Sequence, residues 1–311
     1  MNLRQLQLFV GIYEDGSFNR AAERMHATQS GLSMQIRNLE ERLGVRLFER
    51  SARGVTPTFA GNRLYTRAVE ILRQLDSAEG ELRNLSGSVS GPLRVGLMPT
   101  FTRGLVAPVL TEYVREHPHV EVTIVEAYSA SLTEKVANGE VDFAVVPDTA
   151  QPDQIRSRHL GTDREILVRR ADGRLPHLEP IPFSALSEFR LVLPARGNAR
   201  RDAFDDLFHA QGLQVPAVIA MDAMIATLEF VANSEWATIL PATICGSDLN
   251  GKWRTLHPIV DPAPTVRYTV IEPAKKALSP AAAVFLERLE QEYRKSDEAW
   301  KERLLQGYRE K

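Results

Sequence analysis

The chain has 311 residues, of which 43% are hydrophobic and 25% charged, as in ordinary globular proteins. Its length predicts two or three domains, and its formal net charge of −2 excludes a protein that coats nucleic acid by bulk charge. The amino end lacks a secretory pattern, and no apolar run reaches the length of a membrane span, so we expect a soluble, cytoplasmic protein.

Residues 1–57 are predicted to form three helices and a hairpin. The first helix covers residues 3–14 and turns an apolar face inward, which includes Leu3. Ser17 can cap a second helix that ends at Met25, and Gln29 starts the third. Two short helices joined by a tight turn, the second with polar side chains near its amino end, are typical of a helix-turn-helix, whose second helix enters the DNA major groove.

The third helix has an apolar stripe that runs from Leu32 to Leu43, whereas its other face is rich in short donors and acceptors. Gln, Ser and Thr can read base edges, and Arg contacts guanine or phosphate. An ordinary surface helix is the alternative, but the next segment, VRLFERSARGVTPT, has the pattern of a wing with arginines for the DNA backbone or minor groove. The predicted DNA-binding residues are Thr28, Gln29, Ser30, Ser33, Met34, Arg37, Arg50 and Arg53.

Residues 58–90 are predicted to form a long linker helix and a hinge, which ends in the Ser- and Gly-rich stretch LSGSVSGP. Apolar residues recur at alternating steps of four and three, which is typical of a heptad seam between two helices. A plain core helix is the alternative. A dimer would present two recognition helices to a two-fold DNA site. The predicted seam consists of Leu64, Ala68, Ile71, Leu75, Ala78, Leu82 and Leu85.

From residue 91 onward, strand-like runs alternate with helical stretches, which predicts an α/β fold with a parallel sheet. The expected strands are 93–98, 120–127, 141–147, 189–194, 216–221 and 236–241, with two more, 252–259 and 266–273, that return the chain. Helices are expected at 103–116, 131–138, 199–211 and 222–232.

The ordered set GSFNRAAERMHATQS, QIRNLE, LFER and RGVTPT resembles the amino-terminal winged helix of LysR-type transcriptional regulators. Ser30 and Met34 depart from the residues usual there, and RGVTPT with ILRQ resembles the nitrogen-assimilation-control branch. The resemblance implies a winged helix-turn-helix (1–57), a dimerising linker helix (58–90) and a periplasmic-binding-protein-like effector domain (91–311), with lobe I at 91–162 and 268–311 and lobe II at 163–267. It also implies a homodimer or homotetramer on a pseudo-palindromic operator, a small-molecule effector and RNA polymerase as a further partner.

The effector site is expected beyond the carboxyl ends of the strands, where helix amino termini point. Hydroxyls at those termini, with an arginine opposite, would suit a small anion such as a carboxylate. Thr100 and Thr102 follow the first strand directly and match the family best. Simple helix caps are the alternative for the hydroxyls. The predicted effector-binding residues are Pro99, Thr100, Phe101, Thr102, Ser129, Ser131, Pro147, Arg196, Asn198 and Arg200.

No pattern for catalysis, a cofactor or a metal stands out in the sequence. His117 and His119 lack the partners of a zinc site, and the single cysteine, Cys245, is expected to be buried. No phosphate-binding loop, dinucleotide-binding glycine motif or nucleophile elbow is present. A small-molecule-binding protein or α/β enzyme with a helical dimerisation appendage remains the alternative to a DNA-binding regulator, but it would not need the exposed Thr28, Gln29, Ser33 and Arg53.

Overall fold

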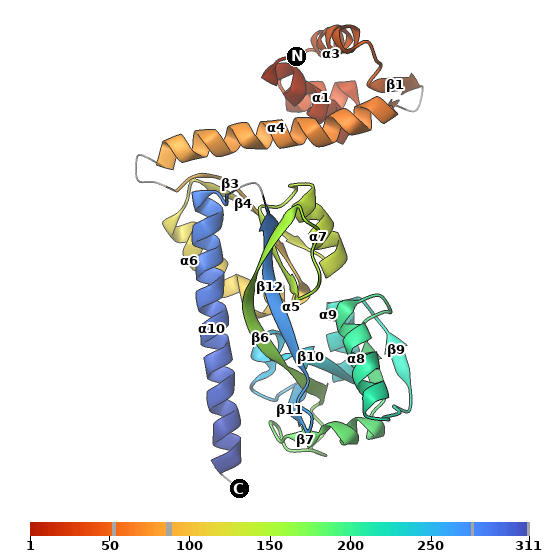
Figure 1. Cartoon of the computed structure of the whole chain (residues 1–311), viewed down its shortest axis with the longest axis vertical. Coiled ribbons are helices and arrows are strands. Elements are labelled where there is room, and N and C mark those ends of the chain that lie inside the picture. The colour runs from red at the N-terminus through yellow and green to blue at the C-terminus, as the bar shows by residue number, and fades with distance from the viewer. Residues whose placement is uncertain (52–53, 85–88, 275–276, 310–311) are drawn as a thin grey trace. The chain divides into compact units, whose positions relative to one another are not determined.

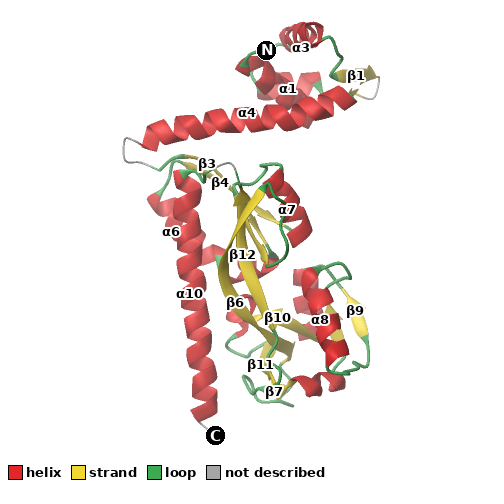
Figure 2. Cartoon of the chain, viewed as in Figure 1, coloured by secondary structure: helices red, strands yellow, loops and turns green. Residues whose placement is uncertain are grey.

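The computed structural model describes residues 1–51, 54–84, 89–274 and 277–309. Contacts within the chain divide it into two compact units, Met1–Gly87 and Ser88–Lys311. Within the described ranges, no helix is both long enough and apolar enough to cross a bilayer. Figures 1 and 2 show the elements of each unit.

The first unit is a helical domain with a two-stranded wing. Its elements are α1 (Leu3–Asp15), α2 (Phe18–Arg24), α3 (Gln29–Leu43), β1 (Phe48–Ser51), β2 (Gly54–Pro57) and α4 (Phe59–Asn84). Asn2 and Ser17 cap α1 and α2 through their side chains, as Ser17 was expected to do. Gly16 and Gly44 end α1 and α3 at positive φ, which glycine adopts without strain.

The core of this unit is formed by side chains from all four helices and the wing. Phe9 and Phe18 both contact the ring of Phe48, which ties α1 and α2 to β1. The expectation that Leu3 turns inward was wrong, because Leu3 is 42% exposed, and Leu43, the last residue of the apolar stripe on α3, is 40% exposed. Both lie near the end of a helix, where the apolar stripe runs past the edge of the core.

The second unit has two lobes, which share a sheet. We call lobe I the part around β3 (Gly91–Leu97), β4 (Val120–Glu126) and β5 (Phe143–Pro147), and lobe II the part around β8 (Leu191–Leu193), β9 (Val218–Ala220) and β10 (Ala237–Pro241). These strands pair in parallel within each lobe. The remaining strands are β6 (Ile155–Arg170), β7 (Ile181–Pro182), β11 (Arg254–Val260) and β12 (Thr265–Pro273).

The lobes are joined by β6 and β12, which pair antiparallel over almost the whole length of β12. The sheet order is β4-β3-β5-β12-β6-β10-β8-β9, so the sheet is mixed rather than purely parallel. The 16-residue β6 was not predicted as a strand, because its exposed and charged outer half hides the apolar run in its second half. Helices cover the sheet: α5 (Pro99–Gly104), α6 (Val106–Glu116), α7 (Ser129–Ala137), α8 (Ala199–Ala210), α9 (Met224–Ala232), α10 (Pro280–Arg309) and two 3-10 segments, η1 (Phe183–Glu188) and η2 (Ala242–Asp248).

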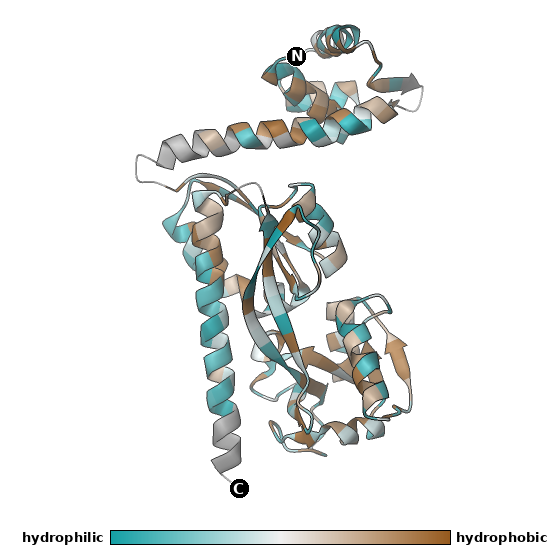
Figure 3. Cartoon of the chain, viewed as in Figure 1, coloured by the Kyte–Doolittle hydropathy of each residue, from teal (hydrophilic) through white to brown (hydrophobic). Residues whose placement is uncertain are grey.

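The last helix, α10, packs on both lobes. Phe285, Leu289 and Tyr293 lie in the core of lobe I, whereas Trp300 is 3% exposed and lies in a core cluster of lobe II. Figure 3 shows hydrophobic residues concentrated along the strands, with much of α10 hydrophilic. The helix therefore spans the junction between the lobes through a few buried apolar side chains.

A direct contact between α5 and η2 also joins the lobes. Arg103 pairs with Asp248 at 2.8 Å and donates to the carbonyl oxygen of Ile244, and Asp248 is paired in turn with Arg254 at 2.9 Å. A Cβ at Gly104 would lie 2.4 Å from the carbonyl oxygen of Thr243. This close approach requires glycine at residue 104.

Candidate functional site

The amino end of α3 presents a short polar surface. Thr28 is the N-cap, and its hydroxyl accepts from the backbone N–H of Gly31 at 3.2 Å. Gln29 is exposed and donates through its amide to the hydroxyl of Ser33 at 3.1 Å. Met34 is 58% exposed on the same helix. Thr28, Gln29, Ser33 and Met34 come from the first two turns or so of the helix, so all four side chains can reach a groove that admits the helix end.

The other predicted DNA-binding residues lie on α3 and in the wing. Ser30 is exposed beside Thr28, with the two hydroxyl oxygens 3.5 Å apart. Arg37 is exposed two turns after Ser30 on the same helix. Arg50 lies on β1, where its backbone pairs with Val55 of β2. Arg53 lies outside the described residues.

Helix α4 contains the predicted dimer seam, but the first part of that seam packs against the core of its own unit. Ala68 is fully buried in the unit's own core and Leu64 packs against it, so a surface role for Ala68 was wrong. Further along, Ile71 is 37% exposed, Leu75 is half-buried and Ala78 is exposed. The side chain of Leu82 and the whole of Leu85 lie outside the described residues.

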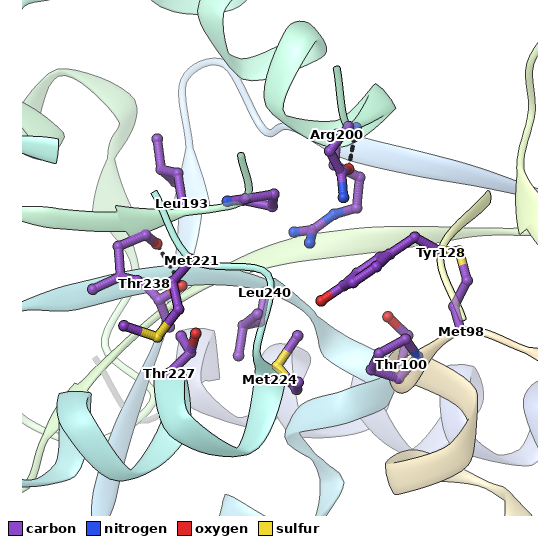
Figure 4. Close-up of a pocket in the computed structure, with 14 residues that line it drawn as sticks. Met98, Thr100, Tyr128, Leu193, Arg200, Met221, Met224, Thr227, Thr238 and Leu240 are labelled. Atoms are coloured by element: carbon purple, nitrogen blue, oxygen red, sulfur yellow. Dashed lines mark hydrogen bonds between the residues drawn. The ribbon is translucent and has the colours of Figure 1, made fainter. Parts of the chain in front are cut away.

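A narrow cavity between the lobes has an inner space of only about 20 Å³, enough for about one water molecule. Figure 4 shows side chains of both lobes around it, with Tyr128 reaching into the space between them. Four of the predicted effector residues line it, namely Pro99, Thr100, Asn198 and Arg200. The other lining residues are not among the predicted effector-binding residues: Met98, Tyr128, Val192, Leu193, Pro194, Met221, Met224, Thr227, Thr238 and Leu240.

The remaining predicted effector residues are elsewhere. The side chain of Phe101 is fully buried in the core of lobe I, against the rings of Tyr268 and Tyr293, so placing it in the site was wrong. The hydroxyl of Thr102 donates to Glu126. Ser129, Ser131 and Arg196 do not line this cavity, and Pro147 lines a second one described below.

Arg200 and Glu165 form a buried ion pair beside the cavity. Nε and Nη2 of Arg200 lie 3.0 and 2.7 Å from the two Glu165 carboxylate oxygens, and Nη2 also donates to the carbonyl oxygen of Ile239. Burial opposes the positive charge, but the Glu165 carboxylate outweighs it and raises the pKa of Arg200. Since its charge is already balanced, Arg200 is not a free cation that awaits a carboxylate.

Tyr128 and the methionines are the residues that the sequence analysis missed most clearly. Burial, with Asp222 and Glu126 nearby, raises the pKa of Tyr128, so its hydroxyl stays protonated and can donate. Tyr128 follows β4 and Met221 follows β9. The rule that ligands lie beyond strand ends could therefore have found both residues. Met224 and Thr227 come from α9 and carried no comparable signal.

Two family models match the chain. Residues 3–62 match the model described as bacterial regulatory helix-turn-helix protein, lysR family, and residues 86–294 match the LysR substrate binding domain. The chain is 31% identical over 294 residues to the nitrogen assimilation regulatory protein nac of Escherichia coli (strain K12), which covers 93% of this chain and 94% of the relative. The nac protein of Klebsiella aerogenes is 32% identical with the same coverage.

Solved structures with a similar fold cover almost the whole chain. A full-length OxyR variant from Pseudomonas aeruginosa has a TM-score of 0.69 at 23% identity and covers 94% of this chain and 95% of its own. Full-length CbnR in complex with its target DNA has a TM-score of 0.69 at 22% identity and covers 94% of this chain and 100% of its own. At these identities the likeness shows the fold.

Proposed function

Because the chain belongs to the LysR family, and is thus a transcriptional regulator with an effector-binding domain rather than an enzyme, we propose that it binds a pseudo-palindromic operator through α3 and the wing. The exposed Gln29–Ser33 pair at the amino end of α3 carries this proposal, because paired amide and hydroxyl groups suit base edges. The operator contacts proposed are those of Thr28, Gln29, Ser30, Ser33, Met34, Arg37, Arg50 and Arg53.

We further propose that the protein acts in the cytoplasm as a homodimer or homotetramer, with RNA polymerase as a partner at the promoter. Exposed Ile71 and Ala78 on α4 support a dimer seam on the part of the helix beyond its own core. Two linked copies would bind DNA much more tightly than either copy alone, because the second contact becomes intramolecular.

A selection of genomic fragments by the purified protein, at about 150 mM salt, near physiological ionic strength, tests the DNA-binding proposal. Enrichment of one short palindrome is the expected result. Retention of all fragments at the level of random DNA would contradict it.

The effector proposed is a small anionic metabolite held where Thr100, Asn198 and the amino end of α8 meet. Helix amino termini favour anions, and Asn198 caps α8 at that point. An uncharged ligand is the second candidate, favoured by the neutralised Arg200–Glu165 pair and the three methionines of the lining. Met side chains repack easily, so the narrow cavity can widen around a ligand.

Thr100→Ala distinguishes this site from a role in folding. The variant should bind operator DNA as the wild type does but lose the response to the effector found through the neighbouring genes. An unchanged response would remove Thr100 from the site.

A further inference from the structure

A second cavity in the effector domain lies between α8 of lobe II, the end of β5 in lobe I and the start of β12. Its volume is about 410 Å³, which is within the range of small-molecule pockets. This is much more space than the 20 Å³ of the cavity around Thr100. Arg200 lines both cavities, whereas its partner Glu165 lines the second one.

The wall of the second cavity is mainly apolar. Ala203, Phe204 and Leu207 face it from α8, and Val266 faces it from β12. Phe204 and Val266 are 4% and 8% exposed, so their positions are fixed by packing rather than free to fill the space. This wall suits a branched or aromatic hydrocarbon group.

The rim carries one carboxylate and one guanidinium, held side by side by the sheet. Tyr268 pairs with Pro147 in the β5–β12 register, and the backbone N–H of Asp148 donates to the carbonyl oxygen of Arg267 at 2.8 Å. Nε of Arg267 consequently lies 3.3 Å from a carboxylate oxygen of Asp148. Their side chains are 62% and 42% exposed, and exposed ion pairs of this kind contribute little to stability. A ligand can therefore replace this ion pair, with each of the two side chains binding the ligand instead of the other, at a small cost in free energy.

The charges of the lining residues cancel. Asp148 and Glu165 are negative, whereas Arg200 and Arg267 are positive, and Glu165 and Arg200 satisfy each other. A simple anion or a simple cation would gain from one rim group and be repelled by the other. A zwitterion meets both, since its carboxylate can pair with the guanidinium and its ammonium with the carboxylate.

From these observations we propose that this cavity binds a free α-amino acid with an apolar side chain. Arg267 holds the carboxylate, Asp148 holds the ammonium group, and the side chain lies between Phe204, Leu207 and Val266. The carboxylate and the ammonium group of an α-amino acid are attached to the same carbon. Their close spacing matches that of the Arg267 guanidinium and the Asp148 carboxylate, which are in contact with each other.

Calorimetric titration of the full-length protein with L-leucine and L-phenylalanine tests the proposal. Two analogues of leucine, 4-methylpentanoate and 3-methylbutylamine, each lack one charged group and should bind at least about tenfold more weakly. Asp148→Asn and Arg267→Gln should weaken leucine binding to a similar extent. Failure of both amino acids to bind, or equal binding of the analogue without the ammonium group, would overturn the proposal.

Ala203→Leu and Ala210→Leu give a matched pair on α8. Both alanines are exposed, so neither variant disturbs the core, but only residue 203 lines the cavity. Ala203→Leu should abolish amino-acid binding and leave thermal unfolding unchanged, whereas Ala210→Leu should bind as the wild type does. Undiminished binding by the Ala203→Leu variant would place the amino acid elsewhere and overturn the assignment.

Discussion

Glu165 matters at the scale of single residues, because it balances a guanidinium that water does not reach. Glu165 and Arg200 have side chains only 3% and 6% exposed. Removal of one partner of a buried pair leaves an uncompensated charge and typically costs about 3–5 kcal/mol. We expect Glu165→Gln to lower the free energy of unfolding by this amount in chemical denaturation.

The exposed Asp148–Arg267 pair supplies the control, since Asp148→Asn should cost about 0–1 kcal/mol. If Glu165→Gln and Asp148→Asn lower the free energy of unfolding by similar amounts, burial of the Glu165–Arg200 pair does not increase its contribution to stability.

His257 is buried in β11 with both ring nitrogens engaged. Nδ1 lies 3.1 Å from the carbonyl oxygen of Glu179, and Nε2 lies 2.9 Å from the hydroxyl of Thr255. Burial lowers the pKa of His257 from 6.5 to about 4. Between pH 6.5 and pH 4, His257 is protonated in the unfolded chain but neutral in the folded chain. The contribution of His257 to the free energy of unfolding therefore falls by up to about 3 kcal/mol as the pH drops from 6.5 to 4.

Asp163 acts in the opposite direction. It accepts from the backbone N–H of Thr243 at 3.0 Å, and burial raises its pKa from 3.8 to about 6. A raised carboxyl pKa favours folding at low pH, and this contribution is lost as the pH rises from about 4 to about 6. The two groups offset each other in the wild type.

Denaturation of His257→Asn and Asp163→Asn variants between pH 4 and 7 separates the two contributions. Relative to the wild type, His257→Asn should lose less stability on acidification and Asp163→Asn should lose more. Parallel pH profiles for the three proteins would contradict the assignment.

Among the elements, α3 is the one that we propose reads the DNA sequence. We expect Gln29→Ala and Ser33→Ala each to reduce the discrimination between operator and random duplex by about 1–3 kcal/mol. Arg53→Ala, in the predicted wing, should weaken binding to both duplexes alike and lower the salt slope by about one. Equal losses on both duplexes for Ser33→Ala would rule out base reading by this residue.

Helix α10 supports lobe II through one aromatic ring. Trp300 is buried among apolar residues, and its Nε1 has no hydrogen-bond partner. Trp300→Ala should lower the free energy of unfolding by about 3–5 kcal/mol. Trp300→Phe should cost far less, because it keeps much of the packing and removes an unsatisfied donor. Thermal unfolding of the two variants checks this contrast.

Most elements could be predicted from the sequence, because their periodicity and caps are local. The helix around Leu32 and the cap at Ser17 illustrate this. By contrast, β6 was missed, since its outer half pairs with β12 more than a hundred residues away and no local pattern records that pairing. Site residues next to strand ends, such as Thr100, were within reach of the sequence. The pairing of Arg200 with Glu165, which removes Arg200 as a partner for an anionic effector, could not be predicted, because only the fold brings the two side chains together.

At the scale of the whole molecule, we expect the contact between α5 and η2 to oppose hinge motion of the lobes. Since a methyl group at residue 104 would lie 2.4 Å from the Thr243 carbonyl oxygen, Gly104→Ala has to displace η2. We expect a marked loss of thermal stability and a weaker effector response. Gly246→Ala, in η2 itself, meets no atom within 4 Å and should behave as the wild type. Equal unfolding temperatures for the two variants would contradict this view of the contact.

The position of α10 in the chain also has a consequence for synthesis. Strand β12 lies in the middle of the sheet, between β5 and β6, and Trp300 completes a cluster in lobe II, yet both come near the carboxyl end. Chains emerge from the ribosome amino end first, and domains fold as units. The first unit can therefore fold while translation continues, but the effector domain reaches its final packing only after β12 and Trp300 have been synthesised. During that interval a nascent regulator would carry a folded DNA-binding unit before it can respond to an effector.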